Sequence, residues 1–266
     1  MLGKLIKHEF KSTYRIFVPI YIGLALLIAA ACLFIELLKH YNSAPLTIIS
    51  GFGIILLVFG IIFVFISPYI FLSMRFYKTT ATREAYLTFT VPAETHQILL
   101  GKFIVSFLWT VITLILSYFS IAIICSTGGA NIKDMFNFMF DGDMELIAIQ
   151  GISFLLSCAL SILQIFTAIS LGQLVRDHRI IASLAFYAAL YTVQQIISVV
   201  VLLPFMITEM SKDMSTGIDT FSMSLGTNTD GMPVSIFLLS IIISVVFSVV
   251  FFFLSNYILK KKLNLL

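Results

Sequence analysis

Five glutamines are the residues best suited to chemistry within the long apolar runs of this sequence. A glutamine side chain donates and accepts hydrogen bonds without carrying a charge, so it can act where a charged group would be costly. The five are Gln150, Gln164, Gln173, Gln194 and Gln195. Two roles remain open for them: hydrogen bonds between neighbouring helices, and a polar track along a substrate path. We take Gln164, Gln194 and Gln195 as the candidate substrate-path residues.

The sequence lacks the motifs of the common enzyme and metal sites. No GxxxxGK[ST], HExxH or GxSxG pattern occurs, and the Gly101-Lys102 pair lacks the other residues of a phosphate-binding loop. The histidines fall in the flanks of apolar runs or between them, which disfavours a buried histidine base or metal ligand. They are His8, His40, His96 and His178. We therefore expect that the chain is not an enzyme and carries no catalytic residue, metal site or cofactor of its own.

Six apolar runs, each long enough to cross a bilayer, must position the glutamines. Hydrophobic residues make up 60% of the 266 residues and charged residues 11%, a composition far from that of a soluble domain. No run alternates with a period of two, so we predict an all-α membrane protein with a single transmembrane domain over residues 1–266. Pro68 and Pro204 fall near run ends, where we expect bends or exits. The predicted spans are 16–38, 46–74, 98–125, 146–175, 180–207 and 234–259.

The positions of the basic residues predict how the chain is oriented. All but three of the 16 lysines and arginines lie before the first span, between spans two and three or in the first turns of span three, between spans four and five, or after the last span. The exceptions are Lys39, Lys133 and Lys212. Because lysine and arginine are enriched in cytoplasmic loops, we expect a multi-pass protein of the cytoplasmic membrane with both termini in the cytoplasm. A nucleic-acid partner has no support.

The first 15 residues form an amphipathic pattern ahead of the first span. At 100° per residue, the apolar side chains from Leu2 to Phe17 fall on one side of a helix, and Lys4, Lys7, Lys11 and Arg15 fall on the other. This pattern is typical of a helix that lies in the membrane interface. We therefore predict an N-terminal amphipathic elbow helix over residues 1–15 that contacts membrane lipids.

The loop 75–97 between spans two and three carries a second helical pattern. Ala85, Tyr86 and Phe89 recur at helical spacing, and Pro92 disfavours the helical conformation of the residue before it. Glu94 or Thr95 can cap a new helix that continues into span three. Exposed aromatic side chains on such a loop need lipid headgroups or another protein to cover them.

Two segments resemble a known family. The stretch EAYLTFTVPAETHQILLGK resembles the loop between the first two core helices of ABC-2 type transporter permeases, and LIKHEFKSTYRIF is similar to the amphipathic start of that family. One departure is Glu94, where the family pattern carries a small hydroxyl residue. The resemblance extends to the layout of the whole chain, with an elbow helix, six spans, short outer loops and a basic tail.

The resemblance implies that a short cytoplasmic coupling helix docks into a groove on a separate ABC ATPase. That ATPase subunit would bind ATP and Mg²⁺, and the permease would pair with a second copy of itself or with a paralogue. The residues that the resemblance assigns to ATPase coupling are Arg83, Glu84, Ala85, Tyr86, Leu87 and Phe89.

The favoured hypothesis is the membrane subunit of an ATP-driven exporter that moves a hydrophobic or amphipathic drug, peptide or lipid. A non-transport membrane protein, such as an immunity or assembly factor, is one alternative. A secondary carrier or channel is another, although no charged residue lies near the middle of a span, where ion-coupled carriers usually keep one. The charged residue nearest to such a position, Glu36, lies one turn from Lys39, as expected of an ion pair at a span end.

The predicted topology can be tested by cysteine labelling. Single cysteines placed in the loop 75–97 and after the last span, in a cysteine-free background, should react with a membrane-impermeant thiol reagent only after the cells are opened. Labelling of the loop in intact cells would contradict the assignment.

Overall fold

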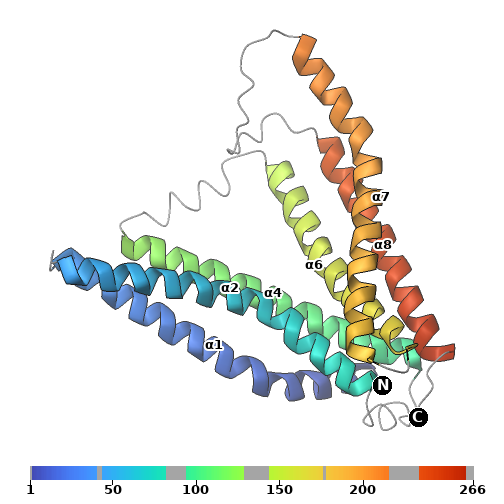
Figure 1. Cartoon of the computed structure of the whole chain (residues 1–266), viewed down its shortest axis with the longest axis horizontal. Helices are drawn as coiled ribbons and strands as arrows, with labels where there is room; N and C mark the ends of the chain where they lie inside the picture. Colours follow the sequence, from blue (N-terminus) through green and yellow to red (C-terminus); the bar gives the residue numbers. More distant parts are fainter. Residues whose placement is uncertain are drawn as a thin grey trace. The chain divides into compact units, whose positions relative to one another are not determined.

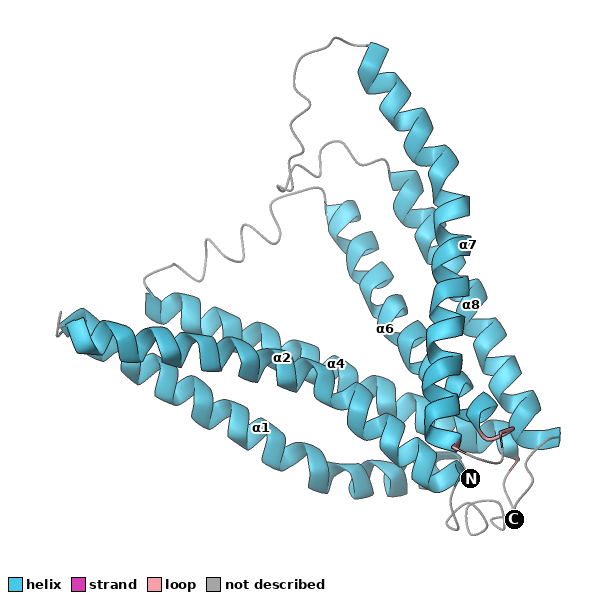
Figure 2. Cartoon of the chain, viewed as in Figure 1, coloured by secondary structure: helices cyan, strands magenta, loops and turns pink. Residues whose placement is uncertain are grey.

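The computed structural model describes residues 2–40, 44–81, 94–128, 144–175, 178–215 and 234–261. Within these ranges the regular structure is helical throughout (Figures 1 and 2). Six of the helices contain a stretch long and apolar enough to cross a membrane, which confirms the predicted all-α architecture. The helices are α1 (Leu2–His40), α2 (Ala44–Ala81), α4 (Thr95–Gly128), α6 (Met144–Gly172), α7 (Arg179–Ser215) and α8 (Val234–Lys261).

Two helix boundaries differ from the predicted spans in ways that matter for function. Helix α1 runs unbroken through both the expected elbow segment and the first span. Helix α2 continues seven residues beyond 74, to Ala81, so the connection to α4 is shorter than the predicted loop 75–97. Residues 82–93 lie outside the described residues. The coupling-helix residues Arg83, Glu84, Ala85, Tyr86, Leu87 and Phe89 fall there, and their assignment stays a prediction.

Both prolines expected near helix ends lie inside long helices, Pro68 in α2 and Pro204 in α7. A proline has no backbone N–H, so Pro68 leaves the carbonyl of Val64 without its usual donor. The hydroxyl of Ser67 donates to that same carbonyl at 2.8 Å. Such replacement of a missing backbone bond lets an apolar helix continue through a proline. Helix α2 therefore extends 13 residues beyond Pro68.

The helices of the predicted single transmembrane domain pack as two compact units, unit 1 with α1, α2 and α4 and unit 2 with α6, α7 and α8. In unit 1 the three helices lie against one another (Figure 1). Its core is formed by Phe17, Leu72, Val105 and Trp109. The indole of Trp109 stacks on Phe10 and on Phe17, with ring centroids 4.9 and 4.6 Å apart. The apolar side of the N-terminal segment thus packs on protein, whereas Lys7, Lys11 and Arg15 are exposed.

Unit 2 is organised around α6, which packs against both α7 and α8. The hydroxyl of Thr167 donates to the carbonyl of Phe251 at 3.0 Å, and the hydroxyls of Ser170 and Ser255 lie 3.1 Å apart. Because the residue numbers rise together along both helices, α6 and α8 run parallel. Only six residues separate α6 from α7, and Gly172 at the end of α6 lies against Ser183 near the start of α7, so these two helices run antiparallel.

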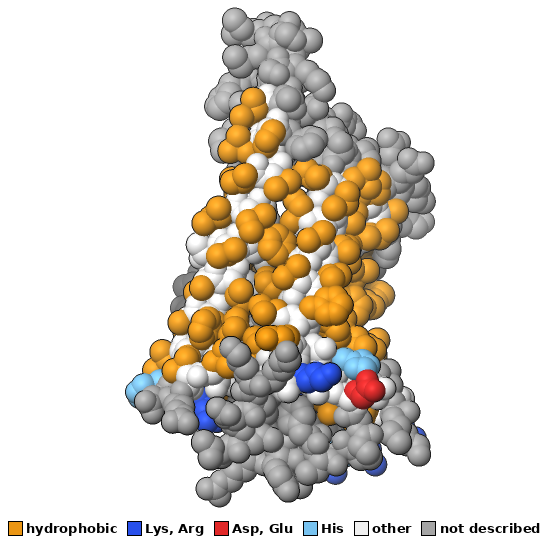
Figure 3. Space-filling model, turned by 90° about the vertical axis from the view of Figure 1, so that its right-hand side faces the viewer, with side chains coloured by type: hydrophobic (Ala, Val, Ile, Leu, Met, Phe, Trp, Pro, Cys, Tyr) orange, Lys and Arg blue, Asp and Glu red, His pale blue; other side chains and the backbone are white. Residues whose placement is uncertain are grey.

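Large apolar side chains are exposed along the described helices. Leu26, Leu184 and Phe253 are examples, and the face drawn in Figure 3 is covered with apolar side chains, with charged side chains gathered at one end. Apolar surface of this extent would be unfavourable in water and is what a lipid surrounding requires.

Gly172 allows α6 and α7 to approach closely. A Cβ atom at this position would lie only 2.7–2.8 Å from the Cβ, Cα and backbone N of Ser183. Two of those three atoms belong to the backbone, so a side-chain rotation cannot relieve the overlap.

We expect Gly172→Ala to force α6 and α7 apart and to destabilise the protein by about 1–3 kcal/mol, the usual range for overpacking. Gly151→Ala is the matched control, since a Cβ at that position of α6 has no atom within 4 Å. Thermal unfolding of the purified chain in detergent should show a lower midpoint for Gly172→Ala alone. Equal midpoints for the two variants would contradict the close contact.

Candidate functional site

Three charged side chains from three helices meet at one end of unit 1. The carboxylate of Glu9 in α1 accepts hydrogen bonds from Arg75 of α2, at 2.9 Å from Nε and 2.6 Å from Nη2. Its other oxygen accepts a hydrogen bond from Nζ of Lys102 in α4, at 2.9 Å. One carboxylate therefore joins all three helices of the unit. We refer to Glu9, Ser12, Arg75, Thr79 and Lys102 as the Glu9 cluster.

Two hydroxyl groups complete the hydrogen bonding of the Glu9 cluster. Nη1 of Arg75 donates to Ser12 Oγ at 2.9 Å, and Nζ of Lys102 donates to Thr79 Oγ1 at 2.8 Å. The Thr79 hydroxyl in turn donates to the backbone carbonyl of Arg75 at 2.9 Å. The cations thus have defined partners in addition to Glu9, as buried charges require.

The Glu9 cluster is largely shielded from solvent. The side chains of Lys102, Glu9 and Arg75 are only 7%, 16% and 18% exposed. Charge-assisted hydrogen bonds are about twice as strong as neutral ones, and burial leaves little water to compete with them. Removing one partner from such a group costs about 3–5 kcal/mol, because it leaves an uncompensated buried charge. The relative positions of α1, α2 and α4 are therefore strongly fixed at this end.

The cluster lies close to both ends of the segment 82–93. Arg75 precedes the end of α2 by about two helical turns, and Lys102 follows the start of α4 by about two turns. The last turn of α2 is closed by Thr80, whose hydroxyl donates to the Phe76 carbonyl at 2.6 Å. At the other end the Glu94 carbonyl accepts hydrogen bonds from the backbone N–H groups of Gln97 and Ile98, which places Glu94 at the predicted start of the helix. Because Arg75 and Lys102 both bind Glu9, the helices at both ends of the segment are joined to α1.

An aromatic layer lies next to the Glu9 cluster. Phe10 follows Glu9 directly, and Trp109 lies two turns along α4 from Lys102, on the same side of the helix. Further along, the hydroxyls of Tyr21 and Thr113 lie 2.7 Å apart and join α1 to α4 a second time. This layer excludes water from one side of the cluster.

The three candidate glutamines are all in unit 2, but in different surroundings. Gln164 of α6 is only 3% exposed, and its Nε2 atom has no hydrogen-bond partner among the described residues. Gln194 of α7 is half-buried, and its Oε1 atom is buried and likewise unpartnered in the described part of the chain. Gln195 is exposed. Gln164 and Gln194 thus each have a buried amide atom, whereas the side chain of Gln195 is exposed.

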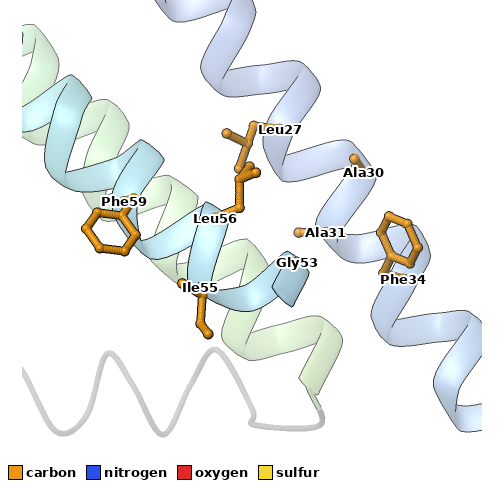
Figure 4. A pocket seen from close by; sticks show the side chains of 8 residues that line it. All are labelled: Leu27, Ala30, Ala31, Phe34, Gly53, Ile55, Leu56 and Phe59. Atoms are coloured by element: carbon orange, nitrogen blue, oxygen red, sulfur yellow. The ribbon is translucent and has the colours of Figure 1, made fainter. Parts of the chain in front are cut away.

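An apolar cavity of about 500 Å³ lies between α1 and α2 in unit 1 (Figure 4). Its lining includes Leu27, Ala31 and Phe34 from α1 and Gly53, Leu56 and Phe59 from α2. Among the described residues, no charged or hydrogen-bonding side chain lines it, so it has room for an acyl chain or a similar apolar group. No pattern in the sequence predicted this cavity.

Within the described ranges, no group of three or more histidine, cysteine, aspartate or glutamate side chains could hold a metal ion. Searches with the chain find no matching family model, no similar curated protein and no similar solved structure. The resemblance to ABC-2 type permeases therefore rests on the two segments quoted above.

Sequence reasoning missed Glu9, the central residue of the cluster. The signal was a single acidic residue among the basic residues of the N-terminal segment, lying at the edge of the apolar side where Thr13 also falls. An acidic side chain in that position needs a cationic partner from elsewhere in the chain. Lys102 is one of the two partners that the structure supplies, and Arg75 is the other.

We expect Glu9→Gln to destabilise the protein by about 3–5 kcal/mol, because two cations lose their shared counter-charge. Glu94→Gln is the control: its pair with His96 is exposed, and exposed pairs contribute little. Adding Lys102→Met to Glu9→Gln removes one surplus charge and should restore part of the loss. The unfolding midpoint in detergent measures all three effects. A Glu9→Gln variant as stable as Glu94→Gln would show that the cluster does not fix the helices.

Proposed function

We propose that the chain is the membrane subunit of an ATP-driven exporter of the ABC-2 type, working with separate cytoplasmic ATPase subunits that bind ATP and Mg²⁺. A second copy of the permease or a paralogue completes the complex. The observation that carries the proposal is the Glu9 cluster, which joins both flanks of the segment 82–93 to α1. Within that segment, Arg83, Glu84, Ala85, Tyr86, Leu87 and Phe89 are the residues proposed to contact the ATPase.

A segment that receives force from a partner needs rigid attachments. If α2 and α4 could slide past each other, displacement of the segment would be absorbed locally and lost. The charge-assisted bonds of Glu9 to Arg75 and Lys102 oppose such sliding, because separating either pair leaves a largely buried charge without its counter-charge. Displacement of the segment would therefore move α1, α2 and α4 together. A partner that favours the displaced position would then shift the population of the whole unit.

The distribution of exposed charge supports a cytoplasmic position for the clustered end. Lys7, Lys11 and Arg15 are exposed on α1 on both sides of Glu9 in the sequence. Exposed cations at one end of a set of apolar helices are typical of the cytoplasmic side. The same side would present the segment 82–93 to a soluble ATPase.

The proposed substrate is hydrophobic or amphipathic, a drug, a peptide or a lipid. The described helices expose apolar side chains along their length, and the one cavity described between α1 and α2 is apolar. Such surfaces suit a molecule that partitions into the membrane before it is moved.

Replacing Tyr86 by alanine should weaken ATPase association by about 1–3 kcal/mol, since a buried aromatic anchor carries an interface. The Tyr86→Ala, Phe89→Ala double variant should lose the ATPase on purification from native membranes and should lose ATP-driven transport. Phe253→Ala removes an exposed aromatic side chain of α8 and should change neither.

Three outcomes decide the proposal. Purification of the natural chain without an ATPase would favour a non-transport membrane protein or a secondary carrier. Full ATPase binding and transport by the double variant would contradict the coupling assignment. A folded Glu9→Gln variant that keeps the ATPase but loses transport would support the role of the cluster in transmitting force.

A further inference from the structure

Unit 2 contains one donor and two acceptors that are each buried and unsatisfied within the described residues, and one of the two acceptors is Oδ1 of Asn256 in α8. Gln164 has an unpartnered Nε2 atom, and Gln194 has an unpartnered Oε1 atom. An unsatisfied polar atom in an apolar interior is unfavourable, and satisfied polar groups are the rule in buried positions. If these glutamines served only to join helices, each would be expected to have a partner on a neighbouring helix.

The packing of α6 on α7 brings the two glutamines to similar heights in unit 2. Gly172 lies directly against Ser183, and the helices run antiparallel from that contact. Gln164 lies eight residues from Gly172, and Gln194 lies 11 residues from Ser183. At ~1.5 Å per residue, their positions along the helices differ by roughly 4.5 Å, less than one turn.

The helical period also gives the side of each helix on which the glutamines lie. Gln194 is about 20° around α7 from Ser183, so it lies on the side of α7 that contacts α6. At 100° per residue, Gln164 is about 80° around α6 from Gly172 and about 60° from Thr167, which bonds to α8. It therefore lies between the sides of α6 that face α7 and α8, and it is almost fully buried. Both glutamines therefore belong to the interior side of their helices, whereas Gln195 is exposed.

We infer that Gln164 and Gln194 bind the amide group of an amphipathic ligand within unit 2. A secondary amide offers a carbonyl that accepts from Gln164 Nε2 and an N–H that donates to Gln194 Oε1, so it satisfies both atoms at once. The apolar part of the ligand would lie against neighbouring side chains of α6 such as Leu160 and Leu163, which are buried.

Helix α7 is the element that gives access to this site. No residue of α7 between Arg179 and Pro204 is buried, so the helix lies at the surface of its unit, where it packs against α6, the helix that carries Gln164. Moving α7 away from α6 would therefore open the contact between the two helices without disturbing a buried residue of α7 in this range. The proposed exporter function is needed only to make the bound amide an exported substrate. The binding site itself needs no ATPase.

The test compares two probes that differ only in the group facing Gln194. N-methyldodecanamide has an N–H, and methyl dodecanoate has an ester oxygen in its place. Saturable binding of each probe to the full chain in nanodiscs can be measured by native mass spectrometry. We expect the amide to bind about tenfold more tightly than the ester, the effect of one well-placed hydrogen bond.

The variants separate the two contacts. Gln194→Leu should abolish the preference for the amide, because it removes the acceptor for the N–H. Gln164→Leu should weaken both probes alike, because both carry the carbonyl that Nε2 binds. Gln195→Leu is the matched control and should leave both affinities unchanged. Should Gln164→Leu fail to fold, Gln164→Met and the Gln194→Leu result still decide the matter.

Equal binding of the two probes by the natural chain would overturn the inference. An amide preference that survives in Gln194→Leu would also overturn it. So would a loss of the amide preference in Gln195→Leu as large as the loss in Gln194→Leu. Higher thermal stability of Gln164→Leu with unchanged probe binding would show that the unsatisfied atoms are only a packing cost. Amide selectivity in a chain that purifies without an ATPase would support the amide site and contradict the exporter function. ATPase binding without amide selectivity would support the exporter function and contradict the amide site.

Discussion

The arrangement of unit 1 depends on one carboxylate that serves two cations. Arg75 and Lys102 come from different helices, and both are too deeply placed to rely on water for their hydration. Glu9 serves both cations, since its Oε2 atom accepts from Arg75 and its Oε1 atom accepts from Lys102. Apolar packing alone would oppose sliding of the helices less strongly, because apolar contacts at neighbouring registers have similar energies. A hydrogen-bonded charge has a single favourable position, so the Glu9 cluster sets the register of α1, α2 and α4.

The described contacts between the helices of unit 2 are uncharged hydrogen bonds and close packing. They include the Thr167 bond to the Phe251 carbonyl, the Ser170–Ser255 pair and the close approach at Gly172. Hydrogen bonds of this kind in membranes contribute about 0.6 kcal/mol on average, well below the cost of breaking a buried charge pair. Small residues allow close packing but do not resist sliding in the way that a directed ion pair does. The two units therefore differ in how readily their helices can rearrange.

The sequence predicted the helices well and their contacts poorly, for physical reasons that particular residues illustrate. Apolar runs of membrane length are a local property, so all six spans could be found without tertiary information. The continuation of α2 through Pro68 depended on Ser67 bonding to the Val64 carbonyl, a detail that a search for helix breakers overlooks. The partners of Glu9 lie 66 and 93 residues away in the chain, and no periodic pattern connects residues at that separation. Gln194 and Gln195 are neighbours that face in different directions, and a helix that is apolar all round gives no sign of which side meets protein.

A difference in rigidity between the two units fits the division of labour that the proposed function requires. The segment 82–93 is attached to helices joined by buried ion pairs, which suits a part that receives force from a partner. The glutamines proposed to bind substrate lie where α7 covers α6 with a single layer and where the closest approach involves Gly172 and Ser183. A binding site must open and close, so its covering helix has to be held by contacts that can be broken at little cost. Strong ion pairs at the glutamines would fix α7 in place, whereas uncharged amides place no such restraint on it.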